Sequence, residues 1–209
     1  MLNLTPGGPV VVFGGSFDPP TMAHVELPPR AAEMLGASRL IYVPAAVSPH
    51  KTEAPPASST HRLAMLRLVL PEGAEIDTRE IDRGGTSFMI DTLHSLRQDI
   101  DSGIALRLLI GTDQMAHFDR WHRWQEILDV APPAVMVRPG VDVQAVLRAI
   151  AVRCGAPVAD QWSSRMLDLP QLDNSSTRAR ARVRRVGGAG SDVPHEVEAY
   201  IQANQLYGG

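Results

Sequence analysis

Residues 10–24 read VVVFGGSFDPPTMAH, a stretch in which an apolar run ends at two glycines, a proline-containing turn follows, and a histidine comes next. We interpret it as a buried strand over 9–13, a tight turn and the start of a helix. Unpaired N–H groups and a partial positive charge at a helix N-terminus attract phosphate, and glycines let a ligand approach the backbone closely. His24 can add a donor or a positive charge there. The stretch therefore predicts a phosphate-binding turn.

The composition is that of a globular protein, with 209 residues, of which 44% are hydrophobic and 21% charged. This length predicts a single domain, 1–209, with 170–209 as a C-terminal helical subregion. A net charge of −3 gives no basic field that would attract nucleic acid or an anionic membrane. The N-terminus lacks the pattern of a signal peptide and no apolar run is long enough to cross a bilayer, so we expect a cytoplasmic protein. The single cysteine, Cys154, excludes an internal disulfide.

Strand-like and helix-like segments alternate along the chain, which predicts a parallel sheet covered by helices on both faces. The expected fold is α/β, a Rossmann-like doubly wound parallel sheet with a small C-terminal helical region. The expected strands are 9–13, 39–43, 74–76, 105–110, 133–137 and 165–169, and the expected helices are 23–35, 58–70, 86–96, 143–151, 175–186 and 193–203. A short helix is also expected to start at 111–113. Pro28 and Pro29 are expected to disturb the first of these helices. Ligands bind at the carboxyl ends of the strands in such sheets.

Two motifs resemble the signatures of the nucleotidylyltransferases, Rossmann-like enzymes that transfer adenylyl or cytidylyl groups. GGSFDPPTMAH at 14–24 is similar to G-G-x-F-D-P-x-H-x-G-H, and NSSTRAR at 174–180 is similar to I-S-S-T-x-x-R. The hydroxyls, helix N–H groups and Arg180 of the second motif fit a phosphate cradle. Taken alone, the same residues also fit a serine-capped helix with a solvated basic face. In the first motif Thr21 stands where the family has its first histidine, and Ala23 where it has glycine.

Further segments narrow the resemblance to the nicotinate-nucleotide adenylyltransferases. They are SPHK at 48–51, TSFMIDTL at 86–93, GTDQM at 111–115 with WHRW at 121–124, VRPG at 137–140, and a tail from 193 to 207 that contains VPHEV, YI and LY. The resemblance runs nearly end to end. It implies transfer of AMP from ATP to nicotinate mononucleotide, which yields deamido-NAD and pyrophosphate in NAD biosynthesis.

The resemblance also implies roles for individual residues. His24, Thr21 and Arg180 would be the catalytic residues. ATP would be held by Gly14, Gly15, Ser16, Phe17, Thr21, His24, Asp113, Ser175, Ser176, Thr177 and Arg180, and the pyridine nucleotide by His50, Lys51, Thr86, Trp121 and His122. The flat ring of Trp121 can stack on a pyridinium. We see no acidic cluster for a metal site built by the protein, so Mg²⁺ is expected to arrive with the triphosphate.

Two other functions stay open at this point. Thr21 also matches the T-x-G-H form found in phosphopantetheine adenylyltransferases, although this chain is longer than that family and contains the pyridine segments 86–93 and 121–124. The changes at Thr21 and Ala23 also fit a nucleotide-binding sensor without catalysis, but the retained His24 and Arg180 argue against it.

Other polar and aromatic side chains have ordinary structural interpretations. We expect Trp124 and Trp162 to be core residues, as buried tryptophans usually are. Asp77, Glu80 and Asp82 are expected to form a solvated face or to be charges at a strand edge.

Overall fold

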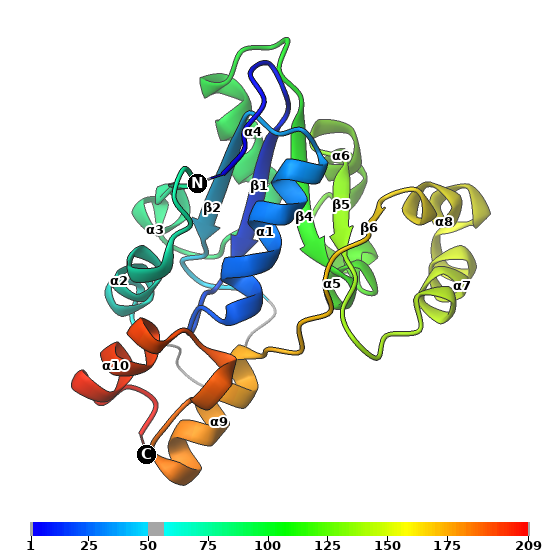
Figure 1. Ribbon diagram of the computed structural model, residues 1–209. Coiled ribbons are helices and arrows are strands. Elements are labelled where there is room, and N and C mark those ends of the chain that lie inside the picture. Colours follow the sequence, from blue (N-terminus) through cyan, green and yellow to red (C-terminus); the bar gives the residue numbers. More distant parts are fainter. Residues whose placement is uncertain (1, 50–56, 209) are drawn as a thin grey trace.

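The structure, a computed structural model, describes residues 2–49 and 57–208 and contains a parallel sheet with the strand order β3-β2-β1-β4-β5-β6 (Figure 1). The strands are β1 (Val10–Gly15), β2 (Arg39–Pro44), β3 (Glu75–Ile76), β4 (Leu106–Gly111), β5 (Pro133–Met136) and β6 (Met166–Leu167). All neighbouring pairs are parallel. The order reverses between β1 and β4, as in doubly wound folds. The expected fold class is confirmed.

The helices differ from the expected set mainly by three short additions. They are α1 (Met22–Met34), α2 (Ser59–Val69), α3 (Arg79–Arg83), α4 (Met89–Asp99), α5 (Thr112–Met115), α6 (Trp124–Val130), α7 (Val143–Cys154), α8 (Ala156–Ser163), α9 (Ser176–Val186) and α10 (His195–Ala203), with 3-10 turns η1 (Phe118–Arg120) and η2 (Gly190–Asp192). The unexpected α3, α6 and α8 have 5, 7 and 8 residues. Such lengths are too short for a helical period to stand out in the sequence. Figure 1 shows α7 and α8 projecting beyond the β6 edge of the sheet.

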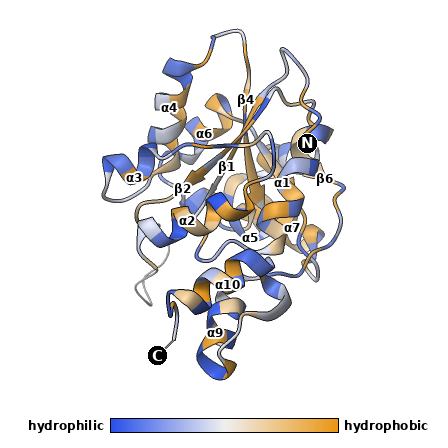
Figure 2. Ribbon diagram, turned by 60° about the vertical axis from the view of Figure 1, so that its left-hand side comes forward, coloured by the Kyte–Doolittle hydropathy of each residue, from blue (hydrophilic) through white to orange (hydrophobic). Residues whose placement is uncertain are grey.

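Alternate side chains of each strand point to opposite faces of the sheet and build two cores. Val10 and Val12 of β1 pack with Leu93 of α4 on one face. Val11 of β1 packs with Ala31 of α1 on the other. Figure 2 shows the strands as apolar segments between amphipathic helices. Because both faces are covered, the central strands β1, β2 and β4 are apolar over most of their length.

The C-terminal helices pack against α2 and lie beyond the carboxyl ends of the strands (Figure 1). Met65 of α2, Ala179 and Val183 of α9, and Val197 and Ile201 of α10 form this third cluster. This packing brings the beginning of α9 to the edge of the sheet at which ligands bind in this fold.

Helix α1 runs uninterrupted through Pro28 and Pro29, so the expected disturbance is absent. A proline at position 28 has no N–H to donate to the carbonyl oxygen of His24, four residues earlier. The hydroxyl of Tyr42 on β2 donates to that oxygen instead, at 2.9 Å. The carbonyl is therefore paired and the helix continues through its prolines.

One expectation for the acidic residues near β3 was wrong. Glu80 on α3 is only 2% exposed, and its Oε1 accepts a hydrogen bond from the Thr92 hydroxyl at 2.5 Å.

The two tryptophans expected in the core differ in how deeply they are buried. Trp162 is 2% exposed, whereas Trp124 is partly buried at the border of the same cluster.

The expected start of α4, at residue 86, was also wrong. The helix begins at Met89, after an extended Phe88, rather than at Thr86–Ser87. The Ser87 hydroxyl instead accepts the N–H of Ala46, at 2.9 Å. This side chain therefore joins the segment before α4 to the loop that follows β2.

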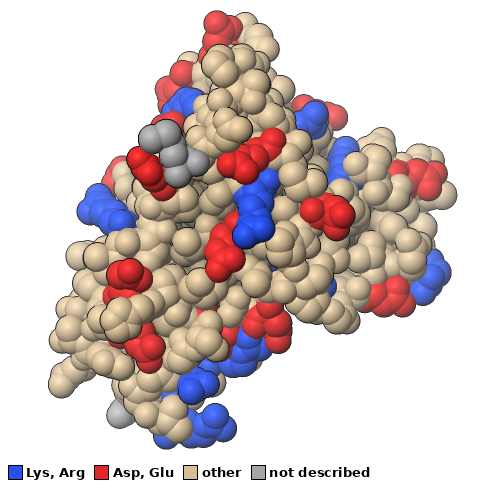
Figure 3. Space-filling model, in the orientation of Figure 1, with Lys and Arg blue, Asp and Glu red and all other residues tan. Residues whose placement is uncertain are grey.

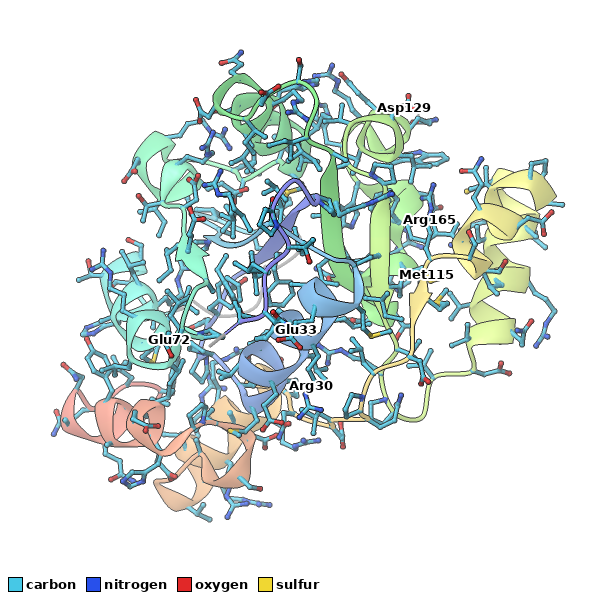
Figure 4. All side chains as sticks on the ribbon, turned by 45° about the horizontal axis from the view of Figure 1, so that its top comes forward. Arg30, Glu33, Glu72, Met115, Asp129 and Arg165 are labelled. Atoms are coloured by element: carbon cyan, nitrogen blue, oxygen red, sulfur yellow. The ribbon has the colours of Figure 1, made fainter. Side chains whose placement is uncertain are left out.

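The surface carries charges of both signs (Figure 3), with Arg side chains gathered at the lower end, where Figure 1 places α9. Arg30 and Glu33 lie on the outer face of α1 (Figure 4). Within the described ranges, no helix is both long and apolar enough to cross a membrane.

Candidate active site

A cavity of about 830 Å³ opens at the carboxyl ends of β1 and β4, where the strand order reverses. Its volume lies in the range of small-molecule binding sites. The lining comes from the first motif, the segment before α4, the loops after β4 and the second motif: Gly14, Gly15, Ser16, Ala23, His24, Ser87, Phe88, Met89, Asp113, Trp121, His122, Asn174, Ser175, Ser176 and Thr177. Segments far apart in the sequence thus share one cavity.

The structure brings most of the sequence-predicted site residues to this cavity. Those that line it are Gly14, Gly15, Ser16, His24, Asp113, Trp121, His122, Ser175, Ser176 and Thr177. Thr21 and Phe17, at 0% and 1% exposure, are buried behind the wall. Arg180 lies beside the first motif, and Thr86 is exposed next to Val47. His50 and Lys51 fall outside the described residues.

The turn after β1 closes over the ring of Phe17. This residue has a φ of 48°, in the left-handed region, and its ring packs edge-on against Phe13 with centroids 5.6 Å apart. A Cβ added at Gly15 would lie 3.0 Å from the Phe17 ring. Glycine at 15 therefore lets the ring fold beneath the turn and leaves the backbone up to Ser16 facing the cavity.

His24 presents a defined hydrogen-bonding edge. Its Nδ1 lies 3.0 Å from the backbone nitrogen of Thr21 and 2.9 Å from the Thr21 hydroxyl. Because a backbone N–H can only donate, Nδ1 is the acceptor, and the proton of the neutral ring is on Nε2. Thr21 therefore orients His24 from behind the cavity wall, and His24 has an Nε2–H donor for a ligand.

The first turn of α9 is joined to the first motif by two hydrogen bonds. The Ser176 hydroxyl donates to the carbonyl of Pro19 at 2.8 Å, and Arg180 Nη1 donates to the carbonyl of Asp18 at 2.6 Å. The Ser176 hydroxyl therefore donates its proton within the protein. The Ser175 hydroxyl accepts a backbone N–H at the start of the helix, so its own proton stays available to an anion.

Two arginines line the cavity although the sequence analysis gave them no role. They are Arg120 and Arg138, and Arg138 Nε lies 3.2 Å from Oδ1 of Asp113. Arg138 follows β5, at the same sheet edge as the predicted site. The rule that ligands bind at carboxyl ends could therefore have selected it. Arg120 sits in η1, where the sequence has no such signal.

Aromatic rings form the end of the cavity near α4 and η1. The Trp121 ring packs on Phe118, with centroids 5.1 Å apart and an interplanar angle of 30°. The Phe88 and His122 rings are 4.7 Å apart. Flat rings in a cavity wall suit a planar heterocycle.

Comparison with known proteins assigns the chain to a family. The Cytidylyltransferase-like family model matches residues 12–182. A probable nicotinate-nucleotide adenylyltransferase of Laribacter hongkongensis is 34% identical over 99% of this chain and 97% of its own length. One of Gemmatimonas aurantiaca is 37% identical over 94% and 90%. The chain belongs to the nicotinate-nucleotide adenylyltransferase family.

A solved structure of a protein from a different organism has the same fold. The nicotinic acid mononucleotide adenylyltransferase of Plasmodium falciparum, complexed with NaAD, matches 96% of this chain with a TM-score of 0.74 and 15% identity. This likeness shows the fold that nicotinate-nucleotide adenylyltransferases of low sequence identity can share.

In this nicotinate-nucleotide adenylyltransferase family member, an ion pair supports the start of α9. Asp192 is 6% exposed, accepts the Ser175 N–H at 3.2 Å and lies 2.6 Å from Arg178 Nη2. Burial raises the pKa of Asp192, but the hydrogen bonds from Arg178 and Ser175 outweigh burial and hold its pKa below the usual value.

Asp192→Asn is expected to flatten the acid limb of the stability curve. A carboxyl with a lowered folded-state pKa stabilises the protein above its unfolded-state pKa of about 3.9, and this stability is lost as the pH falls through the folded-state pKa. The free energy of unfolding, from urea titrations between about pH 5 and pH 2, should fall more steeply for the wild type than for the variant. Asp129→Asn, at an exposed position of α6, is the control. Equal slopes for Asp192→Asn and the wild type would contradict the prediction.

Proposed function

We propose that this protein transfers the AMP moiety of ATP to nicotinate mononucleotide and releases pyrophosphate. The observation that carries the proposal is the single cavity that joins both phosphate motifs to the aromatic wall around Trp121. Two nucleotides must meet in such a reaction, and the cavity has a phosphate-binding region and a region suited to a heterocycle. The names of the curated relatives support the same reaction.

The chemistry needs no nucleophile from the protein. A phosphate oxygen of the mononucleotide attacks the α-phosphorus of ATP, a new P–O bond forms, and the bond to the bridging oxygen breaks as pyrophosphate leaves. The enzyme acts by holding two anions in line and by stabilising the charge that develops on the phosphoryl oxygens. Positioning of this kind can supply roughly 7–11 kcal/mol.

We assign the phosphate contacts to the two motifs. His24 donates from Nε2 to the phosphoryl oxygens, and Thr21 holds its ring through Nδ1. At α9, the hydroxyls of Ser175 and Thr177 and the helix N–H groups face the β- and γ-phosphates. Arg180 adds a positive charge to the same phosphates.

Two groups orient the nucleosides in this proposal. Asp113 is 57% exposed at its side chain and lines the cavity, so its carboxylate can accept hydrogen bonds from ribose hydroxyls. Trp121 stacks on the pyridine ring. Arg120 and His122 line the cavity beside it and favour a carboxylate on that ring over an amide.

Nucleotidyltransferases of this kind generally use a divalent metal with ATP. Across residues 2–49 and 57–208, no three His, Cys, Asp or Glu side chains are grouped to hold a metal ion. The acidic residue in the lining at the β4 end, Asp113, is already paired with Arg138. This lining fits a Mg²⁺ ion that the triphosphate brings with it and that keeps most of its waters. An ion held in this way would supply positive charge against the leaving pyrophosphate.

Pyrophosphate release is expected with ATP, Mg²⁺ and nicotinate mononucleotide. Release should be much slower with nicotinamide mononucleotide and undetectable with phosphopantetheine. Equal rates with both pyridine mononucleotides would support adenylyl transfer but contradict a preference for nicotinate over nicotinamide. Activity with phosphopantetheine alone would support the alternative enzyme. ATP binding without turnover on any acceptor would support a nucleotide-binding sensor.

A further inference from the structure

Asp18 is a buried acidic residue that the proposed reaction does not use. Its side chain is among the least exposed in the protein, and the residue is 2% exposed. Oδ1 accepts the N–H of Ala57 at 3.1 Å and the hydroxyl of Tyr207 at 2.6 Å. Oδ2 lies 4.0 Å from Arg180 Nη1, which donates to the Asp18 carbonyl. One carboxylate thus contacts both the C-terminal tail and the phosphate-binding cation.

The tail is folded so that Tyr207 reaches this carboxylate. Gln205 and Tyr207 have φ values of 51° and 62°, and the Leu206 N–H donates to the Ile201 carbonyl, which turns the chain back after α10. Burial, then the hydrogen bond to Asp18, raises the pKa of Tyr207, so its hydroxyl is protonated and donates. Figure 1 shows the C-terminal end beside α9.

A second cation fixes the loops around the same carboxylate. Arg62, 2% exposed, donates to the carbonyls of Ser16, Ala46 and Ala57 at 2.7, 3.3 and 3.1 Å. Asp18 attracts this guanidinium as well. Because Arg62 is committed to three carbonyls, Arg180 is the cation that can approach Asp18 more closely when Oδ1 loses a donor.

We propose that Tyr207 is a positioning residue for ATP, which holds the Asp18 carboxylate away from Arg180 so that the guanidinium stays available to the triphosphate. A buried carboxylate that loses its hydroxyl donor is stabilised by a new hydrogen-bond donor. A guanidinium can supply one, because it can donate to both carboxylate oxygens at once. Such a closed pair would compete with phosphate for Arg180. The inference rests on the proposed function, because that proposal places Arg180 at the ATP phosphates.

The test is ATP affinity, measured by titration calorimetry with Mg²⁺ and no acceptor. Tyr207→Phe keeps the ring and removes the hydroxyl, and it should raise the Kd for ATP about fivefold or more. Tyr200→Phe is the matched control, because its hydroxyl also joins the C-terminal region to α2, at 3.0 Å from His61 Nδ1, but does not contact Asp18. The control should change the Kd less than twofold.

A double-mutant cycle separates positioning from general destabilisation. In an Asp18→Asn background the carboxamide cannot form an ion pair with Arg180, so Tyr207→Phe should then change the Kd less than twofold. An equal loss in both backgrounds, no loss in Tyr207→Phe, or the same loss in Tyr200→Phe would each overturn the proposal. If Tyr207→Phe does not fold, Asp18→Asn alone decides, and weakened ATP binding would overturn it.

The acceptor-free readout keeps the two proposals apart. ATP binding by the wild type without AMP transfer would overturn the proposed function and leave the cycle decisive for Tyr207. Absence of ATP binding by the wild type would overturn both.

Discussion

Replacing His24 by Ala is expected to lower kcat by on the order of 10²-fold or more, as for other donors that stabilise developing charge. Thr21 occupies Nδ1 from behind, at 3.0 Å from its backbone nitrogen, so the Nε2–H is the edge that His24 offers to a phosphoryl oxygen. Removing a contact that strengthens in the transition state lowers kcat and leaves KM nearly unchanged.

The effect of His24→Ala is measured as steady-state pyrophosphate release with both substrates varied. His195→Ala is the control, because His195 is exposed at the start of α10 and is absent from the cavity lining. The melting temperature of both variants is compared with the wild type, so that loss of fold is not read as loss of catalysis. A kcat within threefold of the wild type would remove His24 from the mechanism.

Replacing Arg62 by Met is expected to lower the free energy of unfolding by about 2–4 kcal/mol. The side chains are similar in length, but Met leaves the carbonyls of Ser16, Ala46 and Ala57 without their donor. Burial lowers the pKa of Arg62, and attraction to Asp18 partly offsets that effect, so the cation is held at an electrostatic cost that its hydrogen bonds must outweigh.

Urea unfolding followed by circular dichroism measures the loss in Arg62→Met. Arg67→Met is the matched control, because Arg67 lies on the same helix α2 but is exposed. Its effect should stay within about 0.5 kcal/mol. Arg62→Lys should also be destabilised, since one ammonium cannot take the place of a guanidinium fork that spans three carbonyls. A change below 1 kcal/mol in Arg62→Met would mean that water replaces the guanidinium at little cost.

The sequence identified the sheet because its strands are buried on both faces. The runs that became β1 and β5 are apolar along their whole length and the run that became β4 is apolar apart from Arg107, and this is a local property of each segment. The same holds for the turn after β1, where two glycines and two prolines specify backbone shape directly. The carboxyl-end rule then placed the motifs on one edge of the sheet, which is where the cavity lies.

The short elements and the buried polar groups were not predictable in this way. Helices α3, α6 and α8 have fewer than three turns, so their stability comes from tertiary packing and leaves little periodic signal. Glu80 reads as a surface charge in the sequence because its partner, Thr92, lies on another helix.

Local sequence by itself determined the strands, the glycine turn and the two motifs to which we assign phosphate binding. Only the tertiary structure decided which polar groups pair across the fold: the Tyr42 hydroxyl with the carbonyl freed by Pro28, and Tyr207 with Asp18. The physical reason is that a strand or turn depends on the side chains within a few residues, whereas a long-range hydrogen bond depends on how whole elements pack. That packing is set by apolar burial summed over the molecule, which no single segment contains.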